Sequence, residues 1–171
     1  MAKAPARWDM EADMVVVGSG SGALCSAIRT HDLGGKAIVV ERASKVGGGT
    51  AYSGGSVWVP NNPPMAKLGI KDSREDALAY LTAISGGKHD LEVLEAYIDH
   101  GPRVIRYQEE RMGVRWSVER GMADYYPEGP GGKAEGRFTS PHLFDAKLLG
   151  EWGPKVRISP HSPFAYTDAE A

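Results

Sequence analysis

The chain has 171 residues, of which 42% are hydrophobic and 25% are charged, as is typical of one globular domain. The formal net charge of -2 provides no basic surplus that would favour nucleic acid or an anionic membrane. Cys25 is the single cysteine, which excludes an intrachain disulfide and a cysteine-rich metal site, and the five histidines lack the spacing of metal ligands. The sequence shows neither a secretory signal nor an apolar run of about 18 residues, so we expect a cytoplasmic protein without a transmembrane segment.

Two short apolar runs flank an amphipathic segment near the start of the chain. Residues 14–17 are rich in valine and lie between Asp13 and Gly18, which is typical of a parallel strand buried on both faces. Residues 21–33 carry apolar side chains at helical spacing and are followed by two glycines, which favour a helix end. Residues 37–40 repeat the buried-strand pattern. A crossover of this length predicts a right-handed βαβ unit with parallel strands.

The connection between the first strand and the helix has the pattern G-x-G-x-x-G/A, filled by Gly18, Gly20 and Ala23. Gly18 allows a tight turn, Gly20 lets the backbone approach a pyrophosphate, and Ala23 lets the helix pack closely on the sheet. Glu41 follows Gly20 by 21 positions (41 minus 20), where its carboxylate can accept hydrogen bonds from adenosine ribose hydroxyls. The segment predicts a dinucleotide site at a helix amino terminus; an ordinary glycine-rich turn is the alternative.

The glycine-rich segment after the second strand favours FAD over NAD. Residues 41–50 leave the strand without a helical pattern, and they contain Gly48, Gly49 and Thr50, whose N–H groups and hydroxyl can face phosphate. An NAD-binding domain would more often enter a helix here. A solvated surface loop is the alternative.

The middle of the chain predicts helices, and the last third predicts little regular structure. Ser73 can cap a helix over residues 74–85, and Asp90 can cap another from residue 91, with Gly101 and Pro102 separating this second helix from a third. Weak strand patterns occur at residues 57–59 and 114–118. From residue 121 onward prolines recur without an apolar face that could close a second core, so we infer an incomplete domain.

Residues 13–62 resemble the family of FAD-dependent oxidoreductases that includes the succinate dehydrogenase and fumarate reductase flavoproteins and the 3-ketosteroid dehydrogenases. Within it, residues 48–60 are most similar to the ketosteroid dehydrogenase branch, where a similar glycine arm runs past the pyrophosphate towards the isoalloxazine. A second block resembles the same branch in order and distance. It comprises Asp124-Tyr125-Tyr126-Pro127-Glu128, Pro130-Gly131-Gly132, Gly136-Arg137, Phe144-Asp145 and Leu149-Gly150. The resemblance extends from residue 13 to about residue 152.

The resemblance implies FAD that is held without a covalent bond. In the succinate dehydrogenase branch a histidine precedes the threonine of the arm, whereas this sequence has Gly49 there. That difference, together with the lack of a histidine and arginine cluster to clamp two carboxylates, argues against a dicarboxylate substrate. The residues expected to hold the cofactor are Gly18, Ser19, Gly20, Ser21, Gly22, Ala23, Glu41, Arg42, Gly48, Gly49, Thr50, Ser53, Gly54 and Gly55.

The ketosteroid branch implies oxidation of a ring C–C bond next to a ketone. A tyrosine base removes the proton α to the carbonyl, and hydride passes from the β carbon to flavin N5. Tyr125 matches the family tyrosine that supports the base by hydrogen bonding, and Tyr126 is the alternative by one position. Trp58 and Tyr52 either line a pocket or cover the sheet edge. We expect a small-molecule substrate, with a steroid as the leading class, and no nucleic-acid partner.

The expected organisation is an α/β chain with a Rossmann-like FAD-binding unit, followed by helices and an incomplete substrate domain. A flexible leader (1–12) precedes the βαβ unit and arm (13–60), a helical segment (61–112) and an irregular substrate region (113–171). Family members run to several hundred residues, with the principal base and enolate donors after this region, so we expect an inactive amino-terminal fragment. The alternatives are a flavoprotein of the same family with another substrate and a non-catalytic nucleotide-binding module; the oligomeric state is undetermined.

Overall fold

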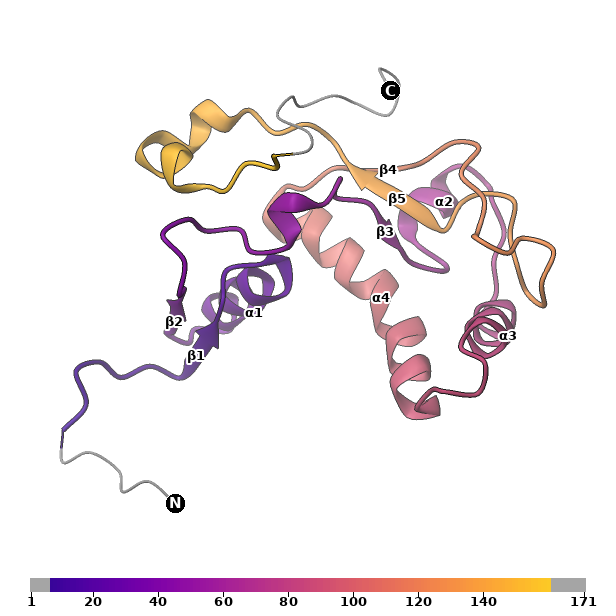
Figure 1. Cartoon of the computed structure of the whole chain (residues 1–171), viewed down its shortest axis with the longest axis horizontal. Helices are drawn as coiled ribbons and strands as arrows, with labels where there is room; N and C mark the ends of the chain where they lie inside the picture. Colours follow the sequence, from indigo (N-terminus) through magenta and orange to yellow (C-terminus); the bar gives the residue numbers. More distant parts are fainter. Residues whose placement is uncertain (1–6, 161–171) are drawn as a thin grey trace. The chain divides into compact units, whose positions relative to one another are not determined.

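The computed structural model describes residues 7–160, which divide into two compact units (Figure 1). The described part of the first unit comprises residues 7–53 and 145–160, and that of the second comprises residues 54–144. This division differs from the expected one, because the last third of the chain contributes to both units. Part of the expected leader and the last eleven positions of the expected substrate region, 1–6 and 161–171, lie outside the described residues.

The first unit is built on a βαβ crossover. Strands β1 (Met14–Val17) and β2 (Ala37–Val40) pair in parallel over all four residues, and α1 (Ser21–Asp32) connects them. Asp13 and Lys36 immediately precede the two strands, and the Asp13 carboxylate accepts a hydrogen bond from the Lys36 backbone N–H at 2.7 Å. The prediction of two parallel strands joined by a helix is confirmed, because β-branched runs and a glycine-bounded helix are local signals.

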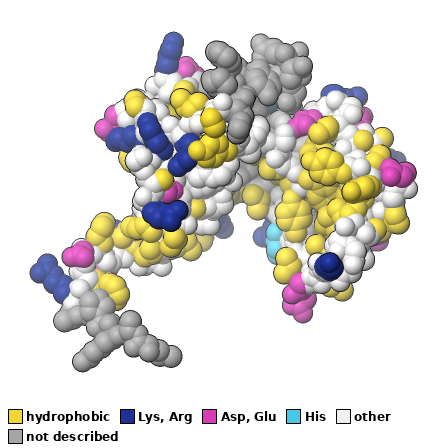
Figure 2. Space-filling view, viewed as in Figure 1, with side chains coloured by type: hydrophobic (Ala, Val, Ile, Leu, Met, Phe, Trp, Pro, Cys, Tyr) yellow, Lys and Arg dark blue, Asp and Glu magenta, His cyan; other side chains and the backbone are white. Residues whose placement is uncertain are grey.

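The strands of this unit are more exposed than the sequence predicts. In β1, Val16 is buried, whereas Val15 and Val17 are 60% and 83% exposed. One helix and one neighbouring strand cover only part of β1, so the expectation of burial on both faces is wrong for this strand. Hydrophobic side chains, yellow in Figure 2, accordingly reach the surface around β1.

Two 3₁₀ segments complete the first unit. The short η1 (Thr50–Tyr52) lies in the glycine arm, and η2 (Ala146–Lys155) is kinked at Gly150, which has a φ of 52°. After η2, an isolated parallel bridge joins Val156 to Val46 at the start of the arm. The chain therefore returns to the arm after more than 100 residues, which no local pattern indicates.

The second unit contains an antiparallel sheet in the order β3-β5-β4. Its strands are β3 (Val57–Trp58), β5 (Phe138–Pro141) and β4 (Trp116–Val118). Weak patterns predicted β3 and β4, but the expectation of little regular structure beyond residue 121 is wrong at β5. The sequence of β5, FTSP, has no hydrophobic alternation, and it forms a strand because β3 and β4 supply backbone partners on both sides.

Three helices pack with this sheet in the same unit: α2 (Pro63–Lys67), α3 (Arg74–Ile84) and α4 (Leu91–Met112). The side chains of Asn62, Ser73 and Asp90 cap them by accepting backbone N–H groups, as predicted for the last two. Residues 59–118 supply most of the core of this unit, and the region after residue 121, which the sequence predicts to lack an apolar face of its own, adds Phe138. The buried apolar side chains of this core are Val59, Met65, Ala77, Tyr80, Ile98, Ile105, Val118 and Phe138.

Helix α4 continues through Pro102, so the predicted break at Gly101 and Pro102 is wrong. Proline removes one backbone hydrogen bond in a helix interior, which normally kinks or ends the helix. Here Ile98 and Ile105, each 3% exposed, anchor the helix on both sides of the proline. A Cβ on Gly101 would lie 3.0 Å from Val59 Cγ1, so glycine lets the helix approach that side chain closely. The packing of Ile98, Gly101 and Ile105 therefore outweighs the helix-breaking tendency of Pro102.

Candidate functional site

The loop between β1 and α1 has open space beside its backbone at Gly18, and so does the first turn of α1 at Gly22. Gly18 has a φ of 95°, and its N–H donates to the Val40 carbonyl at 2.7 Å, which ties the loop to β2. Gly20 is the extended N-cap of α1. A Cβ added at Gly18 or Gly22 would meet no atom within 4 Å. The first-turn N–H groups of a helix have no partner inside the helix, so apart from the Ser21 N–H, which bonds Thr50 Oγ1, the start of α1 offers donors that fit a diphosphate.

Ser19 joins three segments of the first unit beneath this loop. Its side chain is buried, with 2% exposure, and its hydroxyl donates to Glu41 Oε2 at 2.5 Å. The same hydroxyl accepts the Gly47 N–H at 2.9 Å. Ser19 is one of the predicted cofactor residues, and its hydroxyl is occupied within the protein, where it fixes the carboxylate and the arm.

Glu41 is held as an anion at the end of β2. The hydrogen bond from Ser19 and the 2.8 Å bond from the Ala43 N–H lower the pKa of Glu41 below its usual value. An ionised carboxylate is an acceptor only, which suits two ribose hydroxyls. Arg42 follows it with an exposed side chain.

The glycine arm folds back onto the loop. Gly47 and Gly48 have positive φ angles of 116° and 53°, and a Cβ on Gly48 would lie 3.5 Å from Gly20 N. The Ser21 N–H donates to Thr50 Oγ1 at 3.1 Å, so this hydroxyl reaches the amino terminus of α1. Loop, carboxylate and arm therefore converge, and this convergence includes most of the predicted cofactor residues.

The far end of the arm is held by contacts within the first unit. Ser53 Oγ donates to the Thr50 carbonyl at 2.8 Å. The Arg157 guanidinium donates to the Tyr52 hydroxyl at 2.6 Å and lies 5.0 Å from the centre of that ring. Tyr52 thus anchors residue 157 to the arm. Gly49 is the αR N-cap of η1, with open space beside it.

The last two predicted cofactor residues, Gly54 and Gly55, belong to the second unit. A Cβ on Gly55, whose φ is 91°, would lie 3.1 Å from Pro141 Cγ, so this segment runs close to β5. The next residue, Ser56, bonds the Glu119 carboxylate and lies 2.8 Å from the Ser140 hydroxyl. These contacts attach the start of the second unit to its sheet.

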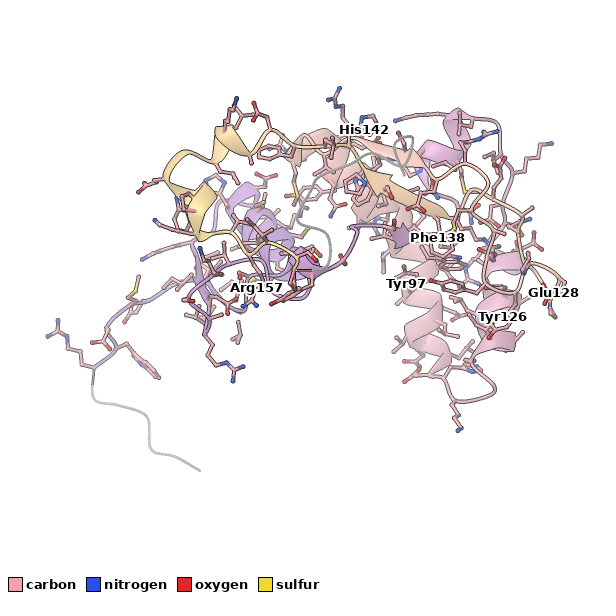
Figure 3. All side chains as sticks on the ribbon, turned by 45° about the horizontal axis from the view of Figure 1, so that its top comes forward. Tyr97, Tyr126, Glu128, Phe138, His142 and Arg157 are labelled. Atoms are coloured by element: carbon pink, nitrogen blue, oxygen red, sulfur yellow. The ribbon has the colours of Figure 1, made fainter. Side chains whose placement is uncertain are left out.

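Tyr125, the candidate catalytic residue, lies in the loop before β5. Its side chain is 75% exposed, and its ring meets Phe138 edge-on, with 5.6 Å between centroids. The backbone N–H of Tyr126 instead donates to the Tyr80 hydroxyl at 3.4 Å, and its side chain is 58% exposed. Figure 3 labels Phe138 on β5 and Tyr126 in the loop. The Tyr125 ring thus makes an edge-on contact with the sheet through Phe138.

A buried charge cluster lies beside this loop, and the sequence did not predict it. Arg137, with 0% exposure, donates to both oxygens of Asp72 at 2.9 and 2.7 Å and to Asp124 at 2.8 Å. Burial favours a neutral guanidine, but Asp72 and Asp124 outweigh it and raise the pKa of Arg137. Asp72 precedes Arg137 by 65 positions, so no short motif joins them.

Trp58 belongs to this cluster. Its ring stacks on Tyr80 and Tyr97 with centroid distances of 5.6 and 6.5 Å, and its Nε1–H donates to Asp124 at 2.7 Å. The Arg137 guanidinium lies 5.2 Å from the centre of the indole. Trp58, on the edge strand β3, therefore packs against the side chains of Tyr80, Tyr97 and Arg137 within the second unit.

Two other kinds of functional feature are absent from the described residues. Between residues 7 and 160, no three or more His, Cys, Asp or Glu side chains gather so that they could hold a metal ion. Over the same range, no helix has the length and apolarity required to cross a bilayer.

Known proteins of one family are similar to this chain over most of its length. The model of a family described as FAD binding domain matches residues 13–164. The 3-oxosteroid 1-dehydrogenase of Mycolicibacterium smegmatis is 41% identical over 140 residues, which are 82% of this chain and 25% of that protein. The 4-oxocyclohexanecarboxylate 2-dehydrogenase of Sinomonas cyclohexanicum is 35% identical over 159 residues, which are 92% of this chain and 28% of that protein.

A solved structure of a protein with a related name is also similar to this chain. The 3-ketosteroid delta1-dehydrogenase from Sterolibacterium denitrificans, in complex with 1,4-androstadiene-3,17-dione, superposes with a TM-score of 0.81 at 42% identity. The match covers 86% of this chain and 26% of that chain. The chain thus spans about a quarter of the length of these relatives.

Proposed function

Because the chain belongs to the FAD binding domain family, we propose that its first unit holds the adenosine and diphosphate of FAD in a dehydrogenase acting beside a ring ketone. The family and its steroid dehydrogenase members indicate FAD as the cofactor. When bound, FAD supplies the acceptor for a hydride. The observation that carries the proposal is the convergence of the open glycine loop, the ionised Glu41 and the Thr50 hydroxyl at one helix amino terminus.

Each part of this site has a distinct task. The bare loop and the first turn of α1 direct N–H groups at the diphosphate, where the helix dipole favours negative charge. Glu41 accepts hydrogen bonds from the ribose, and Ser19 holds that carboxylate in place. Gly49 offers no side chain for a covalent bond to flavin, so we propose that FAD is released intact on denaturation.

The relatives and the position of Tyr125 support the proposed substrate class. The named relatives act on a steroid ketone or on 4-oxocyclohexanecarboxylate, and both compounds carry a ring ketone. The Tyr125 side chain is 75% exposed and its ring contacts Phe138 edge-on, so it is accessible to an apolar substrate such as a steroid. We therefore propose a 3-ketosteroid substrate, with Tyr125 supporting the tyrosine base. A single-ring keto acid is the second candidate.

Cofactor binding is tested with Gly22→Glu. The added carboxylate lies in open space at the start of α1, so it should stabilise that helix by about 0.3–1 kcal/mol through the dipole. The same charge repels a diphosphate. We therefore expect weaker FAD binding, measured by flavin fluorescence titration, with an unchanged or higher melting temperature.

Gly22→Gln is the matched control, since it has the same shape without the charge. It should retain most of the FAD affinity lost in Gly22→Glu. Equal affinity of wild type and Gly22→Glu would place the diphosphate elsewhere. Equal loss in both variants would show that bulk at this position, and not charge, excludes the cofactor.

Turnover is tested with the purified 171-residue chain and added FAD. Since the chain spans about a quarter of its relatives, we propose that alone it does not transfer hydride from substrate. Dye reduction that depends on a 3-ketosteroid would refute that inactivity and establish the steroid class. Reduction with 4-oxocyclohexanecarboxylate alone would favour the second candidate.

A further inference from the structure

One buried carboxylate closes the loop that carries Tyr125. Asp124 is 3% exposed, and its backbone N–H donates to the Lys133 carbonyl at 2.9 Å. In return, the Lys133 N–H donates to Asp124 Oδ2, also at 2.9 Å. The two ends of the loop, residues 124 and 133, are therefore joined through Asp124.

The carboxylate is also fixed from outside the loop. Its Oδ1 accepts the Trp58 Nε1–H at 2.7 Å, and its Oδ2 accepts the Arg137 guanidinium at 2.8 Å. Arg137 is itself held by two bonds to Asp72, whose side chain is 0% exposed. Three donors thus converge on two oxygens, an arrangement that only an acceptor at both positions satisfies.

The rest of the loop is held on α3. A Cβ on Gly131 would lie 2.0 Å from the Asp76 carbonyl oxygen, so the loop backbone and the helix are in close contact. Lys133 Nζ lies 2.7 Å from the Asp76 carboxylate. The ends of the loop are joined through Asp124, and its middle contacts α3. The loop therefore presents Tyr125, the neighbour of Asp124, with its ring edge against Phe138.

We infer that Asp124 is a positioning residue, which holds the Tyr125 ring against Phe138 and so sets the place of its hydroxyl at the substrate. This inference rests on the proposed role of Tyr125. A hydroxyl that supports a catalytic base must be held to within about 0.5 Å, and the surrounding residues provide that precision. Tyr125 is largely exposed, so the Asp124 contacts supply what its own burial does not.

The variant Asp124→Asn isolates the carboxylate. If the amide oxygen faces Trp58, the amide NH₂ meets the donors of Lys133 and Arg137. If the amide turns round, its NH₂ meets the Trp58 Nε1–H. A hydrogen-bond donor faces another donor in either orientation. The loop ends at residues 124 and 133 must therefore shift, and Tyr125 must leave Phe138.

Trp58→Phe removes the conflict in the second orientation. By itself it should preserve the Tyr125 contact, because Asp124 keeps the bonds from Lys133 and Arg137. Combined with Asp124→Asn, it lets the amide oxygen accept both of these donors while its NH₂ faces the phenylalanine. The double variant should therefore regain what the single Asn variant loses, a rescue that a general loss of stability would not give.

The readout is the nuclear Overhauser cross-peak between the Tyr125 and Phe138 rings in the selectively labelled chain, assigned with Tyr125→Phe. We expect the cross-peak in wild type and in Trp58→Phe, its loss in Asp124→Asn, and its return in the double variant. Its persistence in Asp124→Asn, or its absence from the double variant whether folded or not, would overturn the inference. The measurement needs neither FAD nor steroid, so its outcome is separate from that of the proposed function.

Discussion

In the first unit, the Ser19 side chain fixes the positions of two other groups, the Glu41 carboxylate and the Gly47 backbone. Ser19 is one of the predicted cofactor residues, and its hydroxyl connects Glu41 with Gly47. A buried hydroxyl can donate one bond and accept others, so one serine can join the loop, the strand end and the arm. We therefore propose that Ser19 contributes to cofactor binding through the orientation and charge of Glu41.

The charge of Glu41 makes a prediction about pH. Its pKa in the folded chain is lowered, first by the hydrogen bond from Ser19 and then by that from Ala43. A lowered folded pKa means that the stabilisation is present above the unfolded value, here 4.5, and is lost as pH falls through the folded pKa. The difference in melting temperature between wild type and Glu41→Gln should be constant from about pH 8 to pH 5 and shrink below pH 4.5.

A matched control for this measurement is Glu110→Gln, whose side chain is exposed on α4. It should show no comparable change between these pH values. A Glu41→Gln difference that disappears already between pH 7 and pH 5 would contradict the assignment of an ionised, hydrogen-bonded carboxylate.

At the scale of elements, α4 shows how packing decides a helix boundary. Its proline lies between two buried isoleucines, Ile98 and Ile105, and the helix remains continuous. Ile105→Ala should therefore lower the free energy of unfolding by about 2–5 kcal/mol, measured by denaturant titration, because it leaves a cavity in the core. Val104→Ala, at a side chain that is 47% exposed, should change it by at most about 0.5 kcal/mol.

Comparable losses in the two variants would contradict this account of α4. They would mean that the helix is maintained by its own propensity, and not by the isoleucine anchors. Strand β5 illustrates the same principle, because its pairing with β3 and β4 compensates for a sequence with little strand preference.

At the scale of the whole molecule, the exposed face of β1 is a liability for solubility. Val17 is 83% exposed in a parallel pair, whereas Val16 is 7% exposed. Exposed apolar residues on strands promote association between copies of a chain. Val17→Lys should thus reduce aggregation, measured by light scattering, and change the free energy of unfolding by no more than about 0.5 kcal/mol.

Val16→Lys is the matched comparison, because it introduces the same residue at a buried position of β1. It places a charge in the buried position of the same strand, so it should unfold the first unit. Equal effects of the two lysines would show that the alternation of exposure along β1 is not as described.

The sequence by itself determined the features whose signals lie within about 30 residues: the βαβ unit, its glycine loop, the acid at Glu41 and the caps at Ser73 and Asp90. Strand patterns, glycines and capping residues act on their own neighbourhood, so they can be interpreted without a fold. The tertiary structure alone decided β5, the continuity of α4 and the cluster of Arg137 with Asp72 and Asp124. Their partners come from distant segments, and a buried charge has a structural meaning only once the opposite charges that surround it are known.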